Sequence, residues 1–154
     1  MKIAIFTCHN SIWWWGLFLS YFGEAFKRQG YEIDFITCTS AVDYSTAVGL
    51  NLKSSARDKA KVRARSERNT RWLIRGFGFN HVRLETLIRP DESKHPYDKD
   101  VEEKIGVYAS YETILTYKTY TNHTPEMLEM INAFYKGNSI VYAAAESYFK
   151  NFRP

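Results

Sequence analysis

The sequence predicts an α/β fold, with helices packed on a sheet as in an α+β sandwich. Short apolar runs of strand length alternate along the chain with longer stretches that have the 3.6-residue period of helices. From residue 31 onward the predicted order is strand, helix, strand, strand, helix, strand, which is the split β-α-β, or ferredoxin-like, order. One strand and one helix precede it. The length of 154 residues fits a single domain, and a hydrophobic content of 45% is enough for a core.

The first forty residues predict a β-α-β unit. KIAIFTC, residues 2–8, is an apolar run with the length of a buried strand. A helix is expected from about residue 12, because apolar side chains then recur at spacings of three and four. The next strand is YEIDFITCTS, residues 31–40. The run from Ile3 to Gly23 has no Asp, Glu, Lys or Arg, but the polar residues inside it favour a buried strand and helix over membrane insertion.

The most strongly charged segment, residues 54–88, predicts a long basic helix followed by a strand. Ser54 or Ser55 offers an N-cap, and two glycines at 76 and 78 end the helix. HVRLETLI, residues 81–88, alternates with period two and predicts the strand. The side of the helix that is expected to be buried is narrow and consists of Val62, Ser66, Thr70, Leu73 and Phe77.

The second half of the chain predicts a strand, a helix and a strand after an exposed connection. Residues 89–103 contain proline, are mostly acidic and predict that connection. KIGVYASY, residues 104–111, is predicted to be a strand. Thr124 and the proline after it begin a helix that Gly137 is expected to end. SIVYAAA, residues 139–145, is the last predicted strand.

The positive charge of the chain is concentrated on one side of the basic helix. The net charge is +4, a mild basic bias. Like charges on one helix face repel each other, and only Asp58 and Glu67 offset them within this helix. Trp72 is a candidate aromatic anchor beside the cations. Phosphate backbones and acidic surfaces both bind such a face, so the sequence predicts a nucleic acid or an acidic protein as partner. The cations share one sector at 100° per residue and are Arg57, Lys61, Arg65, Arg68, Arg71 and Arg75.

The sequence contains no complete catalytic, cofactor or metal motif. Cys8, His9 and Asn10 stand at the end of the first predicted strand, where α/β folds bind ligands, and they form an alternative candidate pocket. The glycine-rich phosphate loop is absent there, and the four histidines lack the spacing of a zinc site. We therefore expect no catalytic residue, no metal and no cofactor. Cys8 and Cys38 fall in strand-like runs and are expected to be buried free thiols in a reducing cytoplasm.

Three consecutive tryptophans, Trp13, Trp14 and Trp15, stand at the start of the first predicted helix. Side chains of three consecutive residues on a helix point in three directions, so they cannot all enter one core. At least one of them is expected at the surface. The run therefore indicates an interface, including self-association, or packing against the tail of the chain itself.

Two parts of the chain resemble known proteins. The opening, MKIAIFT…GLFLSYFGEAFKRQGYEIDFITC, resembles the first β-α-β unit of GT-B glycosyltransferases over residues 1–40. Residues 65–145 resemble small phage and bacterial accessory proteins. The shared elements there are RSERNTRWLIRGFGFNHVRLE, a central acidic segment, EEKIGVYAS and AFYKGNSIVYA. The second resemblance implies a phage-type accessory protein and brings no catalytic residue with it.

The sequence as a whole favours a cytoplasmic, non-enzymatic accessory or host-interference protein that binds an anionic partner through the basic helix. Two alternatives stay open. One is a small enzyme acting on a nucleotide or a nucleotide sugar at the end of the first strand. The other is a virion or assembly component in which the tryptophan run is buried between copies.

Overall fold

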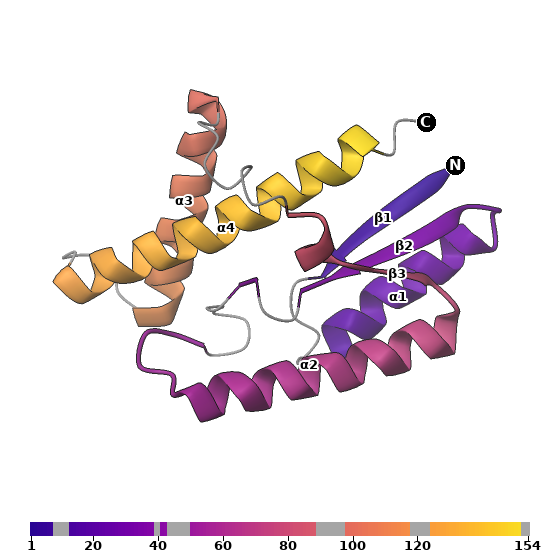
Figure 1. Cartoon of the computed structure of the whole chain (residues 1–154), viewed down its shortest axis with the longest axis horizontal. Helices are drawn as coiled ribbons and strands as arrows, with labels where there is room; N and C mark the ends of the chain where they lie inside the picture. The colour runs from indigo at the N-terminus through magenta and orange to yellow at the C-terminus, as the bar shows by residue number, and fades with distance from the viewer. Residues whose placement is uncertain (8–12, 39–40, 43–49, 89–97, 118–123, 152–154) are drawn as a thin grey trace.

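The computed structural model describes residues 1–7, 13–38, 41–42, 50–88, 98–117 and 124–151. The predicted α/β class is confirmed, since these residues combine a parallel sheet with long helices (Figure 1). In chain order the elements are β1 (Lys2–Thr7), α1 (Trp13–Lys27), β2 (Glu32–Thr37), α2 (Ala56–Phe77), β3 (Asn80–Arg83), the short 3-10 helix η2 (Leu84–Thr86), α3 (Lys99–Tyr117) and α4 (Pro125–Asn151).

The described sheet has the strand order β1-β2-β3, with β2 in the centre. β1 and β2 are parallel, with Lys2 opposite Glu32, and β2 and β3 are parallel, with Asp34 opposite Asn80. Parallel neighbours need a crossover connection, and α1 and α2 supply the two that this sheet requires. The predicted ferredoxin-like order is therefore wrong, because that arrangement has antiparallel neighbours and every described strand pair here is parallel.

Helices α1 and α2 pack side by side on one face of the sheet. Alternate residues of β2, Ile33 and Phe35, point to this face and are buried together with Leu73 of α2. The two helices are joined at their C-terminal ends, where Lys27 Nζ donates a hydrogen bond of 2.6 Å to the carbonyl oxygen of Phe77. The predicted β-α-β unit of the first forty residues is thus confirmed in the described part.

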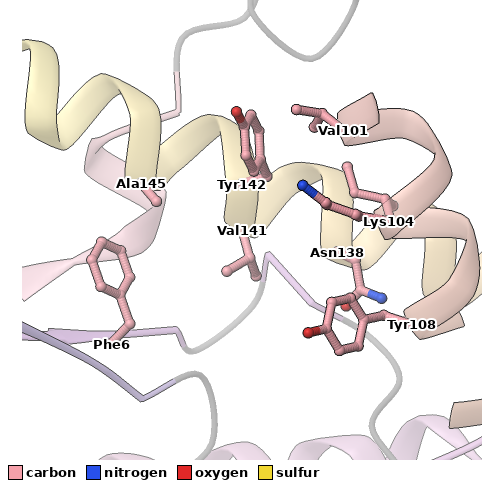
Figure 2. A pocket seen from close by; sticks show the side chains of 9 residues that line it. Phe6, Val101, Lys104, Tyr108, Asn138, Val141, Tyr142 and Ala145 are labelled. Carbon is pink, nitrogen blue, oxygen red and sulfur yellow. The ribbon is translucent and has the colours of Figure 1, made fainter. Parts of the chain in front are cut away.

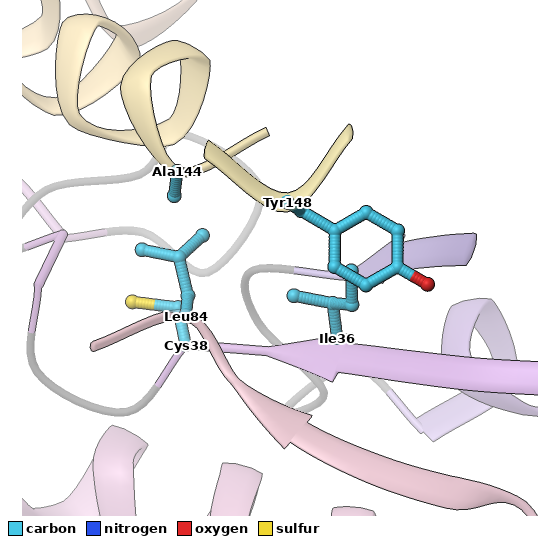
Figure 3. Close-up of a cluster of buried hydrophobic side chains, with 5 residues drawn as sticks. All are labelled: Ile36, Cys38, Leu84, Ala144 and Tyr148. Carbon is cyan, nitrogen blue, oxygen red and sulfur yellow. The ribbon is translucent and has the colours of Figure 1, made fainter. Parts of the chain in front are cut away.

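Helix α4 covers the opposite face of the sheet. Ile36 and Cys38, which alternate with the residues facing α1 and α2, pack against Ala144 and Tyr148 of α4 (Figure 3). Leu84 of η2 completes this cluster and is 1% exposed. The strand predicted over residues 81–88 is therefore only partly right: β3 ends at Arg83, and the 3-10 turn then places Leu84 in the core.

Helices α3 and α4 pack against each other, with Ala109, Met130 and Phe134 buried between them. The strands predicted at residues 104–111 and 139–145 are wrong, because both segments lie within these helices. The predicted cap of α4 is confirmed, as Thr124 Oγ1 accepts a hydrogen bond of 3.3 Å from the backbone N–H of Met127. The predicted connection lies partly outside the described residues, and its end, from Lys99, begins α3.

The buried residues of α3 and α4 explain why helices form where strands are predicted. In α3 they recur every four residues, which is a helical period. Gly137 lies inside α4 and is buried where the helix meets Val42, whose Cγ1 would be 3.3 Å from an added Cβ. Close packing thus accounts for this glycine, which does not end the helix. The buried positions of α3 are Ile105, Ala109 and Thr113.

Candidate functional site

The predicted basic helix is confirmed as α2, a helix of 22 residues with a specific signal at each end. Ser55 Oγ accepts a hydrogen bond from the backbone N–H of Asp58, and the Asp58 carboxylate accepts one from the backbone N–H of Ser55, which is a complete capping box. Gly78 ends the helix in the left-handed conformation, with a φ of 63°. Gly76, which was also expected to end the helix, lies inside it.

The cationic face of α2 points to solvent. The helix is held on the protein by Ser66, Thr70 and Leu73, all of which are buried. At 100° per residue, the cations occupy a sector of about 120° centred on the opposite side of the helix. All six predicted cations, which together define the cationic face, are exposed: Arg57, Lys61, Arg65, Arg68, Arg71 and Arg75.

Within the described part of the chain, none of these six cations forms a salt bridge. Some cations on the other helices are paired within their own helix. Arg28 pairs with Glu24 of the same helix at 3.0 Å, and Lys104 pairs with Asp100 at 2.6 Å. On α2 itself, the Asp58 carboxylate takes part in the N-terminal capping box. Its pKa is lowered mainly by the hydrogen bond from the Ser55 side chain. Among the described residues, the positive charge of the face is therefore not neutralised by a salt bridge.

Trp72 stands beside these cations and is 53% exposed. At 100° per residue its direction falls between those of Lys61 and Arg65. An indole that is half exposed within a cationic sector can stack on a planar group while the neighbouring guanidinium groups hold its charge. The structure thus brings together on one surface all the residues that the sequence predicts for partner binding.

A small depression lined by residues with polar side chains lies next to this face, at the carboxyl ends of β2 and β3. Its volume is about 60 Å³. Thr37 Oγ1 and His81 Nε2 share a hydrogen bond of 2.9 Å at its edge. The pKa of His81 is lowered mainly by burial, and the nearby positive charge of Arg83 lowers it further. The depression is lined by Thr37, Glu67, Thr70, Arg71, His81 and Arg83.

The depression adds five polar residues that the sequence did not predict as site residues: Thr37, Glu67, Thr70, His81 and Arg83. Arg71 belongs to both the cationic face and this depression, so the two features form one continuous surface. The carboxyl ends of parallel strands are where α/β proteins commonly bind ligands. That rule could have indicated Thr37, His81 and Arg83, but only once β3 is known to lie beside β2.

A larger, mostly apolar cavity of about 590 Å³ opens between α3 and α4, next to β1 (Figure 2). Phe6, Val141 and Ala145 line its apolar side, and Tyr108 and Asn138 contribute polar atoms. The one ammonium group among its lining residues, that of Lys104, is held by Asp100 of the same helix. Its described lining residues therefore offer shape and apolar surface, and their one ammonium group is already paired.

The remaining predicted sites are only partly covered by the structure. Cys8, His9 and Asn10, the alternative pocket, lie outside the described residues. Trp13, Trp14 and Trp15 form the first turn of α1, but their side chains also lie outside what the structure describes.

Cys38 is a free, buried cysteine, as predicted, and burial raises its pKa to about 11. Its thiol is therefore protonated near neutral pH and unsuited to nucleophilic attack. Among the described residues, no group of three or more His, Cys, Asp or Glu side chains is arranged to hold a metal ion.

None of the helices in the described part is both long and apolar enough to cross a membrane. Comparison of the whole chain with protein-family models, with curated proteins and with solved structures gives no significant match.

Proposed function

We propose that the protein is a non-enzymatic binding protein that holds the phosphate backbone of a nucleic acid on the cationic face of α2. The setting is a phage-type accessory role, which the sequence resemblance implies, or a host-interference role. The observation that carries the proposal is the exposure of six cations on one side of a single helix, none of which forms a salt bridge within the described chain. A face of this kind attracts polyanions strongly at low ionic strength.

The composition of the face favours phosphate over carboxylate surfaces. Five of its six cations are arginines, whose planar forks bind phosphate oxygens through two hydrogen bonds at once. From Arg57 to Arg75 the face extends for about 27 Å at 1.5 Å per residue, long enough to meet several successive phosphates. Trp72 supplies a ring for base stacking.

The test is fluorescence anisotropy of labelled single-stranded and duplex DNA and RNA across a salt series. We expect log K to fall linearly with log salt concentration, with a slope of magnitude up to about 5 for a duplex if all six cations meet phosphates. Poly-glutamate serves as a carboxylate probe of similar charge. We expect it to bind more weakly than a nucleic acid at equal salt. Equal or tighter binding of poly-glutamate would favour an acidic protein as the partner instead.

Charge-reversal variants distinguish binding by the cationic face of α2 from binding that depends only on the net positive charge of the protein. Arg68→Glu with Arg71→Glu should lower affinity by at least about 10-fold and reduce the magnitude of the salt slope by about 2, because two phosphate contacts are lost. The matched control is Lys99→Glu with Lys136→Glu, which changes the net charge equally at exposed positions on α3 and α4. Loss of binding in the control to the same extent, or full binding in the α2 variant, contradicts the proposal.

A further inference from the structure

β1 is an edge strand whose outer side pairs with no other strand in the described part of the chain. Its residues are less covered than those of the central strand. Ile3, Ala4, Ile5 and Phe6 are only half-buried, whereas β2 is buried from its second residue to its last. Helices cover the two faces of the sheet, so among the described residues its unpaired sides are the two edges, of which β1 forms one and β3 the other.

The backbone geometry shows which groups of β1 point outward. Glu32 donates a backbone hydrogen bond of 3.1 Å to the carbonyl oxygen of Met1, so Met1 directs its carbonyl toward β2. In a parallel ladder, alternate residues of a strand use both backbone groups toward the same neighbour. Ile3 and Ile5 therefore bond to β2, and the N–H and C=O groups of Ala4 and Phe6 point away from the sheet.

This edge lacks the features that usually keep sheet edges apart. Sheet edges that avoid pairing with another chain carry a proline, a bulge or a charged residue in the middle of the strand. Residues 3–7 of β1, IAIFT, contain none of these residue types, and the register with β2 runs without a bulge. The charged residue of β1, Lys2, is at the start of the strand, where its ammonium group lies 3.4 Å from Glu32.

Exposed aromatic rings flank the edge on both faces of the sheet. On the α1 side, Phe18 and Phe22 are 54% and 50% exposed and contact each other with their ring centroids 5.0 Å apart. Tyr21 of the same helix packs on α2, so Phe22 turns toward the β1 side. On the α4 side, Phe149 is 58% exposed, and its ring centroid is 6.3 Å from that of Phe6.

We propose that the occupant of this edge is β1 of a second copy, paired antiparallel so that Ala4 lies opposite Ala4 on a two-fold axis. In this register the two Ala4 residues exchange both backbone hydrogen bonds, and Phe6 of each copy lies opposite Lys2 of the other. The interface is isologous, so it closes with two copies and produces one continuous sheet.

The charges of the edge are compatible with this pairing. The two Lys2 residues would be about 14 Å apart along the strands, given four residues at about 3.4 Å each. That distance exceeds the Debye length of about 8 Å at physiological salt, so their repulsion is weak. The paired edges contribute apolar side chains at the centre, where a charge would oppose dimer formation. The cationic face of α2 takes no part in the pairing, so the dimer would carry two such faces.

The first test is the mass of the full chain by light scattering after size exclusion. We expect a particle of twice 18.0 kDa that dissociates on dilution. Ala4→Pro removes the outward N–H of residue 4 and leaves the hydrogen bonds to β2 in place, so the variant should run as a single folded chain. Ile5→Pro is the contrast, since it removes a bond to β2 and should lower the unfolding temperature.

A second measurement on the unchanged protein keeps the test decisive if Ala4→Pro does not fold. In the dimer, the amides of Ala4 and Phe6 should be protected from hydrogen exchange at high protein concentration and exchange quickly on dilution. The amides of Ile3 and Ile5 should stay protected in both conditions, because they bond within one copy. A single-chain mass at all concentrations, a dimeric Ala4→Pro variant, or fast exchange of Ala4 and Phe6 in the dimer would overturn the proposal. None of these results depends on nucleic-acid binding.

Discussion

Tyr148 donates a hydrogen bond of 2.7 Å from its phenol oxygen to Oδ2 of Asp34, a residue 114 positions earlier in the chain. Both side chains are almost completely buried. The other carboxylate oxygen of Asp34 accepts a hydrogen bond of 3.0 Å from the amide of Asn80. A buried carboxylate is tolerated when its oxygens are satisfied in this way. Through it, the last helix is tied to the centre of the sheet.

We expect Tyr148→Phe to lower the free energy of unfolding by about 2 kcal/mol, because a buried carboxylate loses a hydrogen-bond donor. The ring itself, which meets Phe6 edge-on with centroids 6.0 Å apart, is kept. Urea unfolding followed by circular dichroism measures the change. The control is Tyr111→Phe, at an exposed position of α3, which should shift stability by less than about 0.5 kcal/mol. Equal midpoints for the two variants would show that the bond to Asp34 contributes nothing.

Replacing each of two glycines at the end of α2 with alanine should change the stability of the protein in opposite directions. Gly78→Ala should destabilise the protein by about 1 kcal/mol, since residue 78 has a φ of 63° and an added Cβ would meet Lys27 Nζ at 3.0 Å. Gly76→Ala should stabilise it by up to about 1 kcal/mol, because residue 76 is helical and an added Cβ meets nothing within 4 Å. Thermal unfolding of both variants gives the comparison. The same sign for both would contradict the assigned end of the helix.

The elements that sequence reasoning predicts correctly are those whose signals are local. The N-cap serine, predicted at residue 54 or 55 and found at 55, and the glycine at 78 lie directly beside the helix that they bound. The strand β1 is predicted by its own apolar run. The exposure of the cationic face follows equally from local spacing. These features are therefore predictable before any long-range contact is known.

The errors arise where a long-range contact overrides the local pattern. The segment SIVYAAA has the composition of a strand, but its alanines have a high helix propensity. Their small side chains let α4 lie close to the sheet, with Ala144 fully buried. A glycine at position 137 predicts the end of a helix, and only its close packing against Val42 explains why it lies inside α4. The depression at Thr37 and His81 joins residues that are 44 positions apart, so it could not be predicted without the strand order.

Gly23 allows α1 to approach the sheet closely, and Gly23→Ala should destabilise the protein by about 1–3 kcal/mol. An added Cβ would be 2.8 Å from Cζ of Phe79 and 3.0 Å from Cδ1 of Ile5. The Phe79 ring cannot move aside easily, because it stacks on Phe35 and on Phe77. Chemical denaturation measures the loss. Gly106→Ala, at an open helical position of α3, is the matched control and should be neutral or stabilising.

The depressed pKa of His81 predicts a loss of stability on the acid side of neutrality. Burial and Arg83 lower the pKa of the folded state, so the unfolded chain binds a proton more readily. The stabilising contribution of neutral His81 is therefore fully present above the pKa of the unfolded chain, about 6.5. It is lost as the pH falls from that value through the lower pKa of the folded protein. Urea midpoints measured on either side of about pH 6.5 should show a smaller acid-side loss for His81→Gln than for the native chain. Identical pH dependence in both would contradict the shift.

Trp72→Ala should distinguish stacking from charge attraction on the cationic face. If the exposed indole stacks on a base, its removal should weaken single-stranded DNA or RNA binding by about 1–3 kcal/mol. Duplex binding should change little, because paired bases are not available to the ring, and the salt slope should stay the same because no charge is lost. Anisotropy titrations of both forms measure this, with Tyr111→Ala as an exposed aromatic control on α3. An equal loss for the duplex would point to a packing defect in α2, and no loss for either form would remove Trp72 from the interface.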